Sequence, residues 1–149
     1  MKVTLNHQTA MYKLIRNSGI RYSDILNLEQ SHFNLNQKRI KVISRKTNKT
    51  RYATIRPFDV SFFRLWFKTF KGKLFPFSLS TMHLHMKKFG VPFQLRKDLA
   101  NELQNMNLDK NLIRIKLGLF IDDPDNQIDK TVLFKKLQEI ESQSFTRCE

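Results

Sequence analysis

The chain has 149 residues, of which 40% are apolar, and it contains 13 Phe but only 4 Gly and 4 Pro. This length and composition predict a single domain over residues 1–149 with a packed core. No run of about 18 apolar residues is present, which excludes a transmembrane helix of ordinary length, and the N-terminus lacks the apolar segment of a signal peptide. One cysteine, Cys148, excludes an internal disulfide and is typical of a reducing, intracellular compartment.

The net charge of +14 is concentrated in the first half of the chain. Residues 1–74 hold 16 Lys and Arg against 3 acidic residues (+13), whereas residues 75–149 hold 11 against 10 (+1). Such an asymmetry predicts an electropositive surface that faces a polyanion, and it favours nucleic acid. An anionic membrane is disfavoured because no long helix carries a Lys and Arg face opposite an apolar face.

The first elements predict two helices joined at a tight corner. Residues 7–17 have helical periodicity, and Gly19 is suited to the left-handed conformation that ends a helix. Arg21 follows at the corner, and Ser23 or Asp24 is suited to cap a short helix over about residues 23–29.

The period then changes, and residues 32–56 predict a three-stranded antiparallel meander. Its strands are expected at residues 32–35, 39–44 and 51–56, with turns at Asn36-Gln37 and at residues 46–49. The second turn is flanked by four cations that could project together as one basic finger: Arg45, Lys46, Lys49 and Arg51.

The rest of the chain predicts helices. Asp59 is expected to cap a helix to about residue 70, whose aromatic side chains are expected in the core. Further helices are expected from Ser78 or Ser80 to about residue 89, over residues 92–106, from an Asp109 cap to Gly118, and from an Asp129 cap to about residue 142. The predicted fold class is therefore α+β and mostly helical, with one small three-stranded antiparallel sheet.

Metal and cofactor sites are not expected. His83 and His85 are two residues apart, so they point to different sides of their helix and do not have the spacing of a helical metal pair. Asp122, Asp123 and Asp125 surround Pro124 and are typical of a solvated turn.

Two arginines and a lysine occur in an order that suggests a phosphate-binding site. Arg21 lies at a helix corner, Lys46 lies on a hairpin turn, and Arg96 lies near the start of a later helix. The planar fork of arginine matches two phosphate oxygens, and lysine adds a point charge. Such a site could stabilise the charge that develops at phosphorus without a metal.

The order of these residues resembles the catalytic domain of the tyrosine recombinases, the phage integrase family. The segment Ser18-Gly19-Ile20-Arg21-Tyr22-Ser23-Asp24-Ile25-Leu26-Asn27-Leu28 is similar to the family's first arginine box, T-G-hydrophobic-R-x-S-E-hydrophobic-L-x-L. The family lysine is matched best by Lys46 and second by Lys49, the H-x-L-R box by residues 93–96, and L-G-H by residues 117–119. The resemblance covers roughly residues 4–120 and implies a recombinase-like catalytic domain with Arg21, Lys46 and Arg96 at its site. It also implies that the helical DNA-clamping domain that usually comes first in the family is absent here.

The departures from the family concern the groups that perform catalysis. Phe93 and Leu119 replace the two family histidines, and neither can hydrogen-bond a phosphate. Tyr12, Tyr22 and Tyr52 all precede the second box, and no tyrosine follows Tyr52. The nucleophile is therefore unknown, because phosphotyrosine chemistry needs an activated hydroxyl. Phe134 or Phe145 could stand where a tyrosine is expected.

We therefore expect a DNA-binding protein that keeps the phosphate site but does not form the phosphotyrosine intermediate. Duplex DNA would be bound through the clamp residues and through further cations, namely Arg45, Lys49, Arg51 and Lys97. Two alternatives remain open: an active recombinase that cleaves and rejoins DNA strands, and a basic module that binds an acidic protein. The expected partners are duplex DNA and a second copy or a full-length recombinase, without a membrane. The expected location is the cytoplasm, either at the nucleoid or, for a viral protein, in the host cytoplasm. For a eukaryotic protein the expected location is the nucleus.

Overall fold

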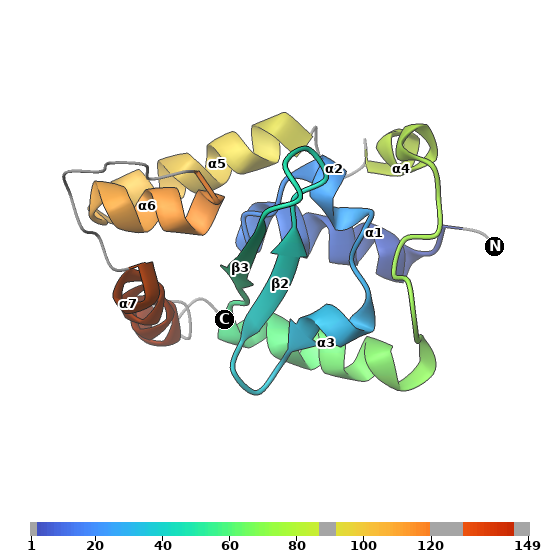
Figure 1. Cartoon of the computed structure of the whole chain (residues 1–149), viewed down its shortest axis with the longest axis horizontal. Coiled ribbons are helices and arrows are strands. Elements are labelled where there is room, and N and C mark those ends of the chain that lie inside the picture. The colour runs from blue at the N-terminus through green and yellow to red at the C-terminus, as the bar shows by residue number, and fades with distance from the viewer. Residues whose placement is uncertain (1–2, 87–91, 120–129, 145–149) are drawn as a thin grey trace.

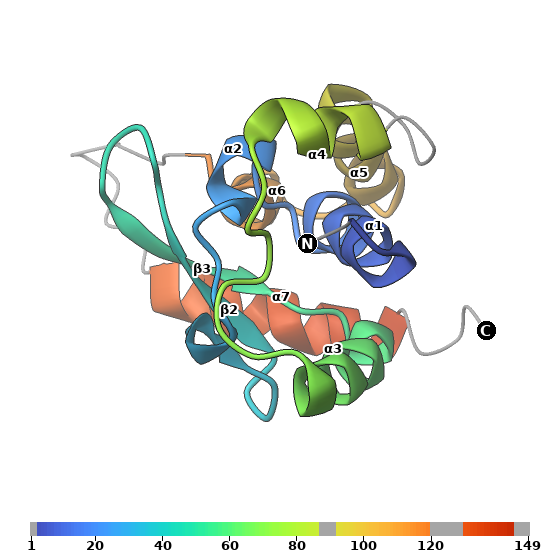
Figure 2. The same ribbon diagram turned by 90° about the vertical axis from the view of Figure 1, so that its right-hand side faces the viewer.

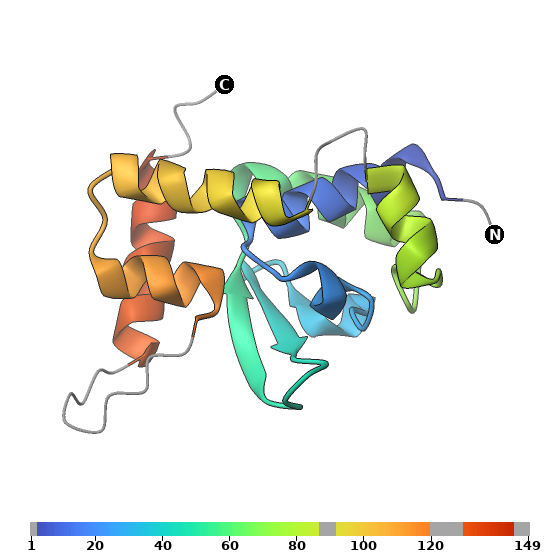
Figure 3. The same ribbon diagram turned by 90° about the horizontal axis from the view of Figure 1, so that it is seen from above.

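A computed structural model of the chain describes residues 3–86, 92–119 and 130–144. The fold is mostly helical with one three-stranded antiparallel sheet in the order β1-β2-β3, which confirms the predicted fold class. The strands are β1 (Phe33–Asn34), β2 (Arg39–Ile43) and β3 (Thr50–Thr54). The sheet stands in the middle of the molecule, with α6 and α7 at one end and α4 at the other (Figures 1 and 3).

The predicted first helix is two elements, α1 (Leu5–Tyr12) and a π-helical turn, η1 (Lys13–Asn17). It begins earlier than predicted because Thr4 and His7 cap each other: the Thr4 hydroxyl accepts from the His7 backbone N–H, and the His7 ring accepts from the Thr4 N–H. The wider turn is closed by the Ser18 N–H, which donates to the Lys13 carbonyl at 3.0 Å.

The second helix, α2 (Tyr22–Ile25), is shorter than predicted and is not capped by Ser23 or Asp24. Its N-cap residue is Arg21, and Asp24 lies inside the first turn. The Asp24 carboxylate instead accepts from the backbone N–H of Arg45 at 3.1 Å and so fixes the β2–β3 turn against α2. A 3₁₀ turn, η2 (Gln30–His32), then leads into β1.

The sheet packs one face against α3 (Pro57–Thr69), where the predicted aromatic residues form much of the core. Ile40 and Val42 of β2 are buried, and Phe33 of β1 packs its ring 5.0 Å from that of Phe67. The predicted Asp59 cap is wrong, since α3 begins at Pro57 after Arg56 as N-cap.

The buried Asp59 carboxylate serves the first helical segment instead of capping α3. It accepts from Lys13 Nζ at 2.6 Å and from Asn17 Nδ2 at 2.9 Å. The strength of these two contacts explains why a carboxylate can stay buried at this point.

The remaining helices are α4 (Leu79–Met86), α5 (Pro92–Asn105), α6 (Lys110–Leu117) and α7 (Lys130–Ser144). Ser78 begins α4 by accepting from the Thr81 N–H, and Asp109 caps α6 as predicted. The Asp129 cap and the acidic loop at 122–126 lie outside the described residues. None of the described helices is long and apolar enough to cross a membrane.

Candidate nucleic-acid interface

The carbonyl oxygen of Gly19 is the point at which four segments of the chain meet. It accepts from Arg51 Nη2 at 3.0 Å and from Arg96 Nη1 at 2.7 Å. Arg96 also donates through Nη2 to the Leu117 carbonyl at 2.8 Å. The η1–α2 corner, strand β3, helix α5 and the end of α6 are therefore joined through two arginine side chains.

Two glycines make this close approach possible. Gly19 and Gly118 have left-handed backbones, with φ of 72° and 69°. A Cβ at Gly19 would collide with the carbonyl oxygen of Lys116, and a Cβ at Gly118 would collide with the Arg51 guanidinium. Backbone conformation favours glycine at both positions, and packing requires it at Gly19, where the obstacle is backbone, whereas a Cβ at Gly118 would displace the Arg51 side chain.

A cavity of about 630 Å³ adjoins this junction. It lies between the corner, strands β2 and β3, the end of α6 and the start of α7, and Asp24 is the only carboxylate among the described residues that line it. Five cations line it: Arg21, Arg39, Lys49, Arg51 and Lys130. The remaining lining includes small polar side chains and apolar ones from Val42, Ile115, Leu119 and Phe134.

The charges at this cavity repel one another. Burial, together with the charges of Arg96 and Arg21, lowers the pKa of Arg51 to about 10, although Asp24 acts in the opposite direction. Burial and the charge of Arg21 likewise lower the pKa of Arg96. Arg51 Nη1 is buried without a hydrogen-bond partner among the described residues. A bound anion would relieve this repulsion and supply the acceptor that is missing.

The structure brings two of the three predicted clamp residues together. Arg21 is exposed and lines the cavity, and Arg96 binds the carbonyl of Gly19, two residues before Arg21, although Arg96 is not among the described lining residues. Lys46 is exposed but does not line the cavity, whereas Lys49, the second match for the family lysine, does. The roles of these residues in binding remain predictions.

The predicted basic finger holds three of its four cations. Arg45, Lys46 and Lys49 are exposed on the β2–β3 turn, which projects from the molecule beside α2 (Figure 2). Arg51 does not project with them, because its side chain folds back to Gly19. Lys97, also predicted to bind DNA, is exposed on α5 and is not among the described residues that line the cavity.

The candidate nucleophile positions and the two positions that replace the family histidines lie in different parts of the molecule. Phe134 and Leu119 line the cavity, and so does Tyr52, whose ring lies 4.8 Å beneath the Arg39 guanidinium. Phe93 is 76% exposed and lies away from the cavity lining. Phe145 lies outside the described residues.

Sequence reasoning missed three residues that line the cavity, namely Arg39, Lys130 and Thr131. The alternation of β2 could have identified Arg39, because Ile40 and Val42 point into the core and their neighbours must point outward. No sequence signal identifies Lys130 or Thr131, since their place depends on how α7 packs against the sheet.

Comparison with known proteins agrees with this architecture. The Phage integrase family matches residues 3–75. The integrase from mycobacterium phage Brujita has a similar fold, with a TM-score of 0.70, 16% identity, and coverage of 95% of this chain and 52% of that one. XerA recombinase is similar with a TM-score of 0.63, 19% identity, and coverage of 93% and 52% respectively.

The chain thus spans about half the length of these two solved structures. No curated protein matches it. The first half of the sequence is thus similar to the Phage integrase family, and the described chain has the integrase catalytic-domain fold.

Proposed function

We propose that this protein binds duplex DNA at the cavity beside Gly19 and holds a backbone phosphate there without forming a phosphotyrosine. Arg21 and Arg51 contact the phosphate, Arg96 positions the corner behind them, and Lys49 adds charge from the hairpin. The similarity of residues 3–75 to the Phage integrase family supports DNA as the partner. The inability to form the covalent intermediate is inferred from the sequence, because no tyrosine follows Tyr52 and Phe134 and Leu119 line the cavity without a reactive hydroxyl or imidazole.

One observation carries this proposal: Arg21, Arg51 and Arg96 gather like charges beside an open cavity, and the hydrogen bonds of Arg51 and Arg96 to the Gly19 and Leu117 carbonyls do not neutralise those charges. Arg51 is partly buried, its pKa is lowered to about 10 by burial and by two neighbouring arginines, and its Nη1 lacks an acceptor. A phosphate supplies both the negative charge and the acceptor oxygens, and arginine binds it with two parallel hydrogen bonds. Preorganised sites of this kind favour the anion because the repulsion has already been overcome in folding.

The test is binding to duplex DNA over a range of salt concentrations. Each phosphate contact that releases counterions contributes about −0.9 to the slope of log K against log salt. We expect steep salt dependence for the unaltered protein and a slope reduced by about 1 in Arg21→Gln. Lys110→Gln is the matched control, since Lys110 is exposed at the far end of α6 and lines no described cavity.

Two results would contradict the proposal. The first is weak salt dependence in the unaltered protein. The second is equal competition by polyglutamate and by duplex DNA of the same charge, which would favour a module that binds acidic proteins.

Strand cleavage is the second candidate function, because one hydroxyl-bearing aromatic residue lines the same cavity. Tyr52 lies beside Arg51 in sequence and shares the cavity with Arg21, although its ring is covered by Arg39. A nicked duplex that traps covalent intermediates distinguishes the two candidates. We expect no adduct from the unaltered protein, and an adduct that Tyr52→Phe abolishes would establish cleavage by this tyrosine.

Phe134→Tyr belongs in the same assay because Phe134 of α7 also lines the cavity. An adduct formed by this variant alone would mean that the cavity keeps a reactive geometry and lacks only the hydroxyl. Absence of an adduct from every variant, together with intact binding, fits the binding function.

A further inference from the structure

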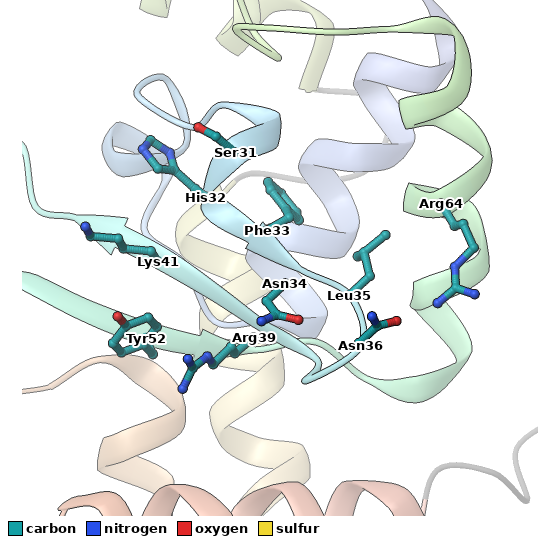
Figure 4. A pocket seen from close by; sticks show the side chains of 10 residues that line it. All are labelled: Ser31, His32, Phe33, Asn34, Leu35, Asn36, Arg39, Lys41, Tyr52 and Arg64. Atoms are coloured by element: carbon teal, nitrogen blue, oxygen red, sulfur yellow. The ribbon is translucent and has the colours of Figure 1, made fainter.

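A second cavity, of about 510 Å³, lies on the outer face of the sheet and extends round its β1 edge towards α3 (Figure 4). It is bounded by β1 and the turn after it, by β2 and β3, and by one residue of α3, Arg64. Gly19, Gly118, Arg51 and Arg96, which form the Gly19 junction, do not line this cavity.

The alternation of β2 explains why this cavity is basic. Ile40 and Val42 point into the core, so Arg39 and Lys41 lie on the opposite face of the strand. The register places Asn34 opposite Arg39 and Tyr52 opposite Lys41, which completes a polar outer face across three strands. Figure 4 shows the side chains of Arg39, Lys41 and Arg64 distributed along the cavity and not gathered at one point.

These cations have no acidic neighbours in the described parts of the chain. Neither Asp nor Glu lines the cavity, and no described carboxylate lies within ion-pair distance of Arg39, Lys41 or Arg64. A solvated basic face that only promotes solubility usually carries both signs of charge. Three unpaired cations that line one hollow indicate a surface for an anionic partner.

The two cavities adjoin. Arg39 and Tyr52 line both of them, and the Arg39 guanidinium lies 4.8 Å from the centre of the Tyr52 ring. Cations therefore line both cavities, with Arg21 in the first, Lys41 and Arg64 in the second, and Arg39 at their shared boundary. An extended polyanion that occupies the first cavity can continue into the second, whereas a small anion cannot reach both.

We propose that the outer face of the sheet is a second DNA-contact surface, which holds the backbone of the duplex segment that flanks the segment bound beside Gly19. This inference rests on the proposed function and extends it. Arg39, Lys41 and Arg64 contact phosphates there, so this surface adds affinity and fixes the path of the duplex without reading sequence.

The test compares duplexes of increasing length with two double variants. Duplexes from about 8 to about 24 base pairs span roughly 27 to 80 Å at 3.4 Å per base pair. Lys41→Gln with Arg64→Gln removes two cations of the second cavity and none of the first. Lys110→Gln with Lys135→Gln removes the same charge from exposed positions that line neither cavity.

The expected result depends on length. For long duplexes the Lys41/Arg64 variant loses about 1.8 from its salt slope, at about 0.9 for each contact, and for the shortest duplex it matches the control variant. A slope equal to that of the control at every length would overturn the second surface and leave the first intact. Weak salt dependence in the unaltered protein would instead overturn the proposed function.

A third outcome also contradicts the inference. If the Lys41/Arg64 variant weakens binding equally at all lengths, its effect is a general one on charge or on folding. A thermal melt of each variant identifies loss of folding, and Lys41→Arg with Arg64→Lys should restore the length dependence because it keeps both charges.

Discussion

At the scale of single residues, the site depends on a carbonyl oxygen more than on any side chain. Gly19 O receives Arg51 and Arg96 together, and it can do so because Gly19 has a left-handed backbone that packs against the Lys116 carbonyl. Arg21 is then carried into the cavity by the next two peptide bonds. The sequence pattern G-hydrophobic-R is therefore a geometric requirement as well as a family signature.

Gly19→Ala tests this requirement, and Gly72→Ala is its control. Gly72 has the same left-handed backbone conformation as Gly19 but no close packing. Gly72 has φ of 88°, and no atom lies within 4 Å of the position a Cβ would occupy. We expect Gly72→Ala to lower the free energy of unfolding by only about 1–2 kcal/mol, the cost of a left-handed alanine. Gly19→Ala should cost more and should also weaken DNA binding, because the displaced carbonyl releases Arg51 and Arg96.

Chemical denaturation and the salt titration described above measure the two effects. Equal losses of stability in the two variants would mean that the close packing at Gly19 is unimportant. Unchanged DNA affinity in a folded Gly19→Ala protein would mean that the junction does not position the phosphate contacts.

The arginines illustrate what sequence can and cannot predict at this scale. Arg21 and Arg96 were identified from a pattern, and the structure brings their charges within electrostatic reach. Arg51 was predicted to project from the hairpin, because local sequence says nothing of the Gly19 carbonyl that faces it in the folded chain. Side-chain direction at a hairpin depends on contacts distant in sequence, and no local pattern encodes them.

At the scale of elements, periodicity predicted which elements exist, and tertiary contacts decided where they begin. The predicted helices and strands overlap the described ones, yet Asp24 and Asp59 were both misassigned as caps. A carboxylate near the start of a helix is typical of an N-cap. Here each accepts a hydrogen bond from a distant segment, Asp24 from Arg45 N–H and Asp59 from Lys13 and Asn17.

The π-helical turn at Lys13–Asn17 is a second feature that periodicity could not predict. The buried positions Leu14 and Ile15 fit an α-helical pattern as well as the observed one. Lys13 and Asn17, the two ends of this turn, both bind the carboxylate of Asp59, at 2.6 and 2.9 Å. These contacts fix the segment that leads directly into the Gly19 corner.

At the scale of the whole molecule, a chain of buried and half-buried charges joins the two halves of the fold. Lys116 of α6 donates to Thr54 Oγ1 at 2.7 Å and to Glu141 Oε2 of α7 at 2.8 Å. Arg56 lies 3.9 Å from the same Glu141 oxygen and donates to Glu102 of α5, which also accepts from Arg16. Burial alone would raise the pKa of Glu102, but the hydrogen bonds and charges of Arg56 and Arg16 outweigh it and lower that pKa.

Sequence reasoning assigned none of these roles, because a charge that will be buried looks like any other charge in a sequence. Lys116 and Glu141 are 1% and 2% exposed, and they join α6 to α7 in the region from which Phe134 and Lys130 reach the cavity. The position of α7 at the candidate site is thus fixed by a buried ion pair 25 residues apart in the chain.

Breaking this pair should be more costly than replacing it. Lys116→Met leaves the Glu141 carboxylate buried without its closest described cation, with Arg56 at 3.9 Å, and we expect it to lower the free energy of unfolding by about 3–5 kcal/mol. Lys116→Met combined with Glu141→Leu removes both charges and should lie closer to the unaltered protein, since apolar pairs often replace buried ion pairs at little cost. Urea denaturation of the three proteins measures this, and equal losses in the single and double variants would contradict it.

The same pair predicts how stability varies with pH. Burial, opposed by Glu141, lowers the pKa of Lys116 from 10.5 to about 8. Between about pH 8 and 10 the unfolded chain therefore binds more protons at this residue than the folded protein does, so rising pH favours the folded state. The double variant lacks Lys116 but keeps the other lysines. Subtracting its stability from that of the unaltered protein therefore removes the contributions of those other lysines. We expect the stability of the unaltered protein, relative to the double variant, to rise from about pH 8 to about pH 10. A difference that stays flat or falls would mean that Lys116 keeps its ordinary pKa, and that its pairing with Glu141 fully offsets the cost of burying it.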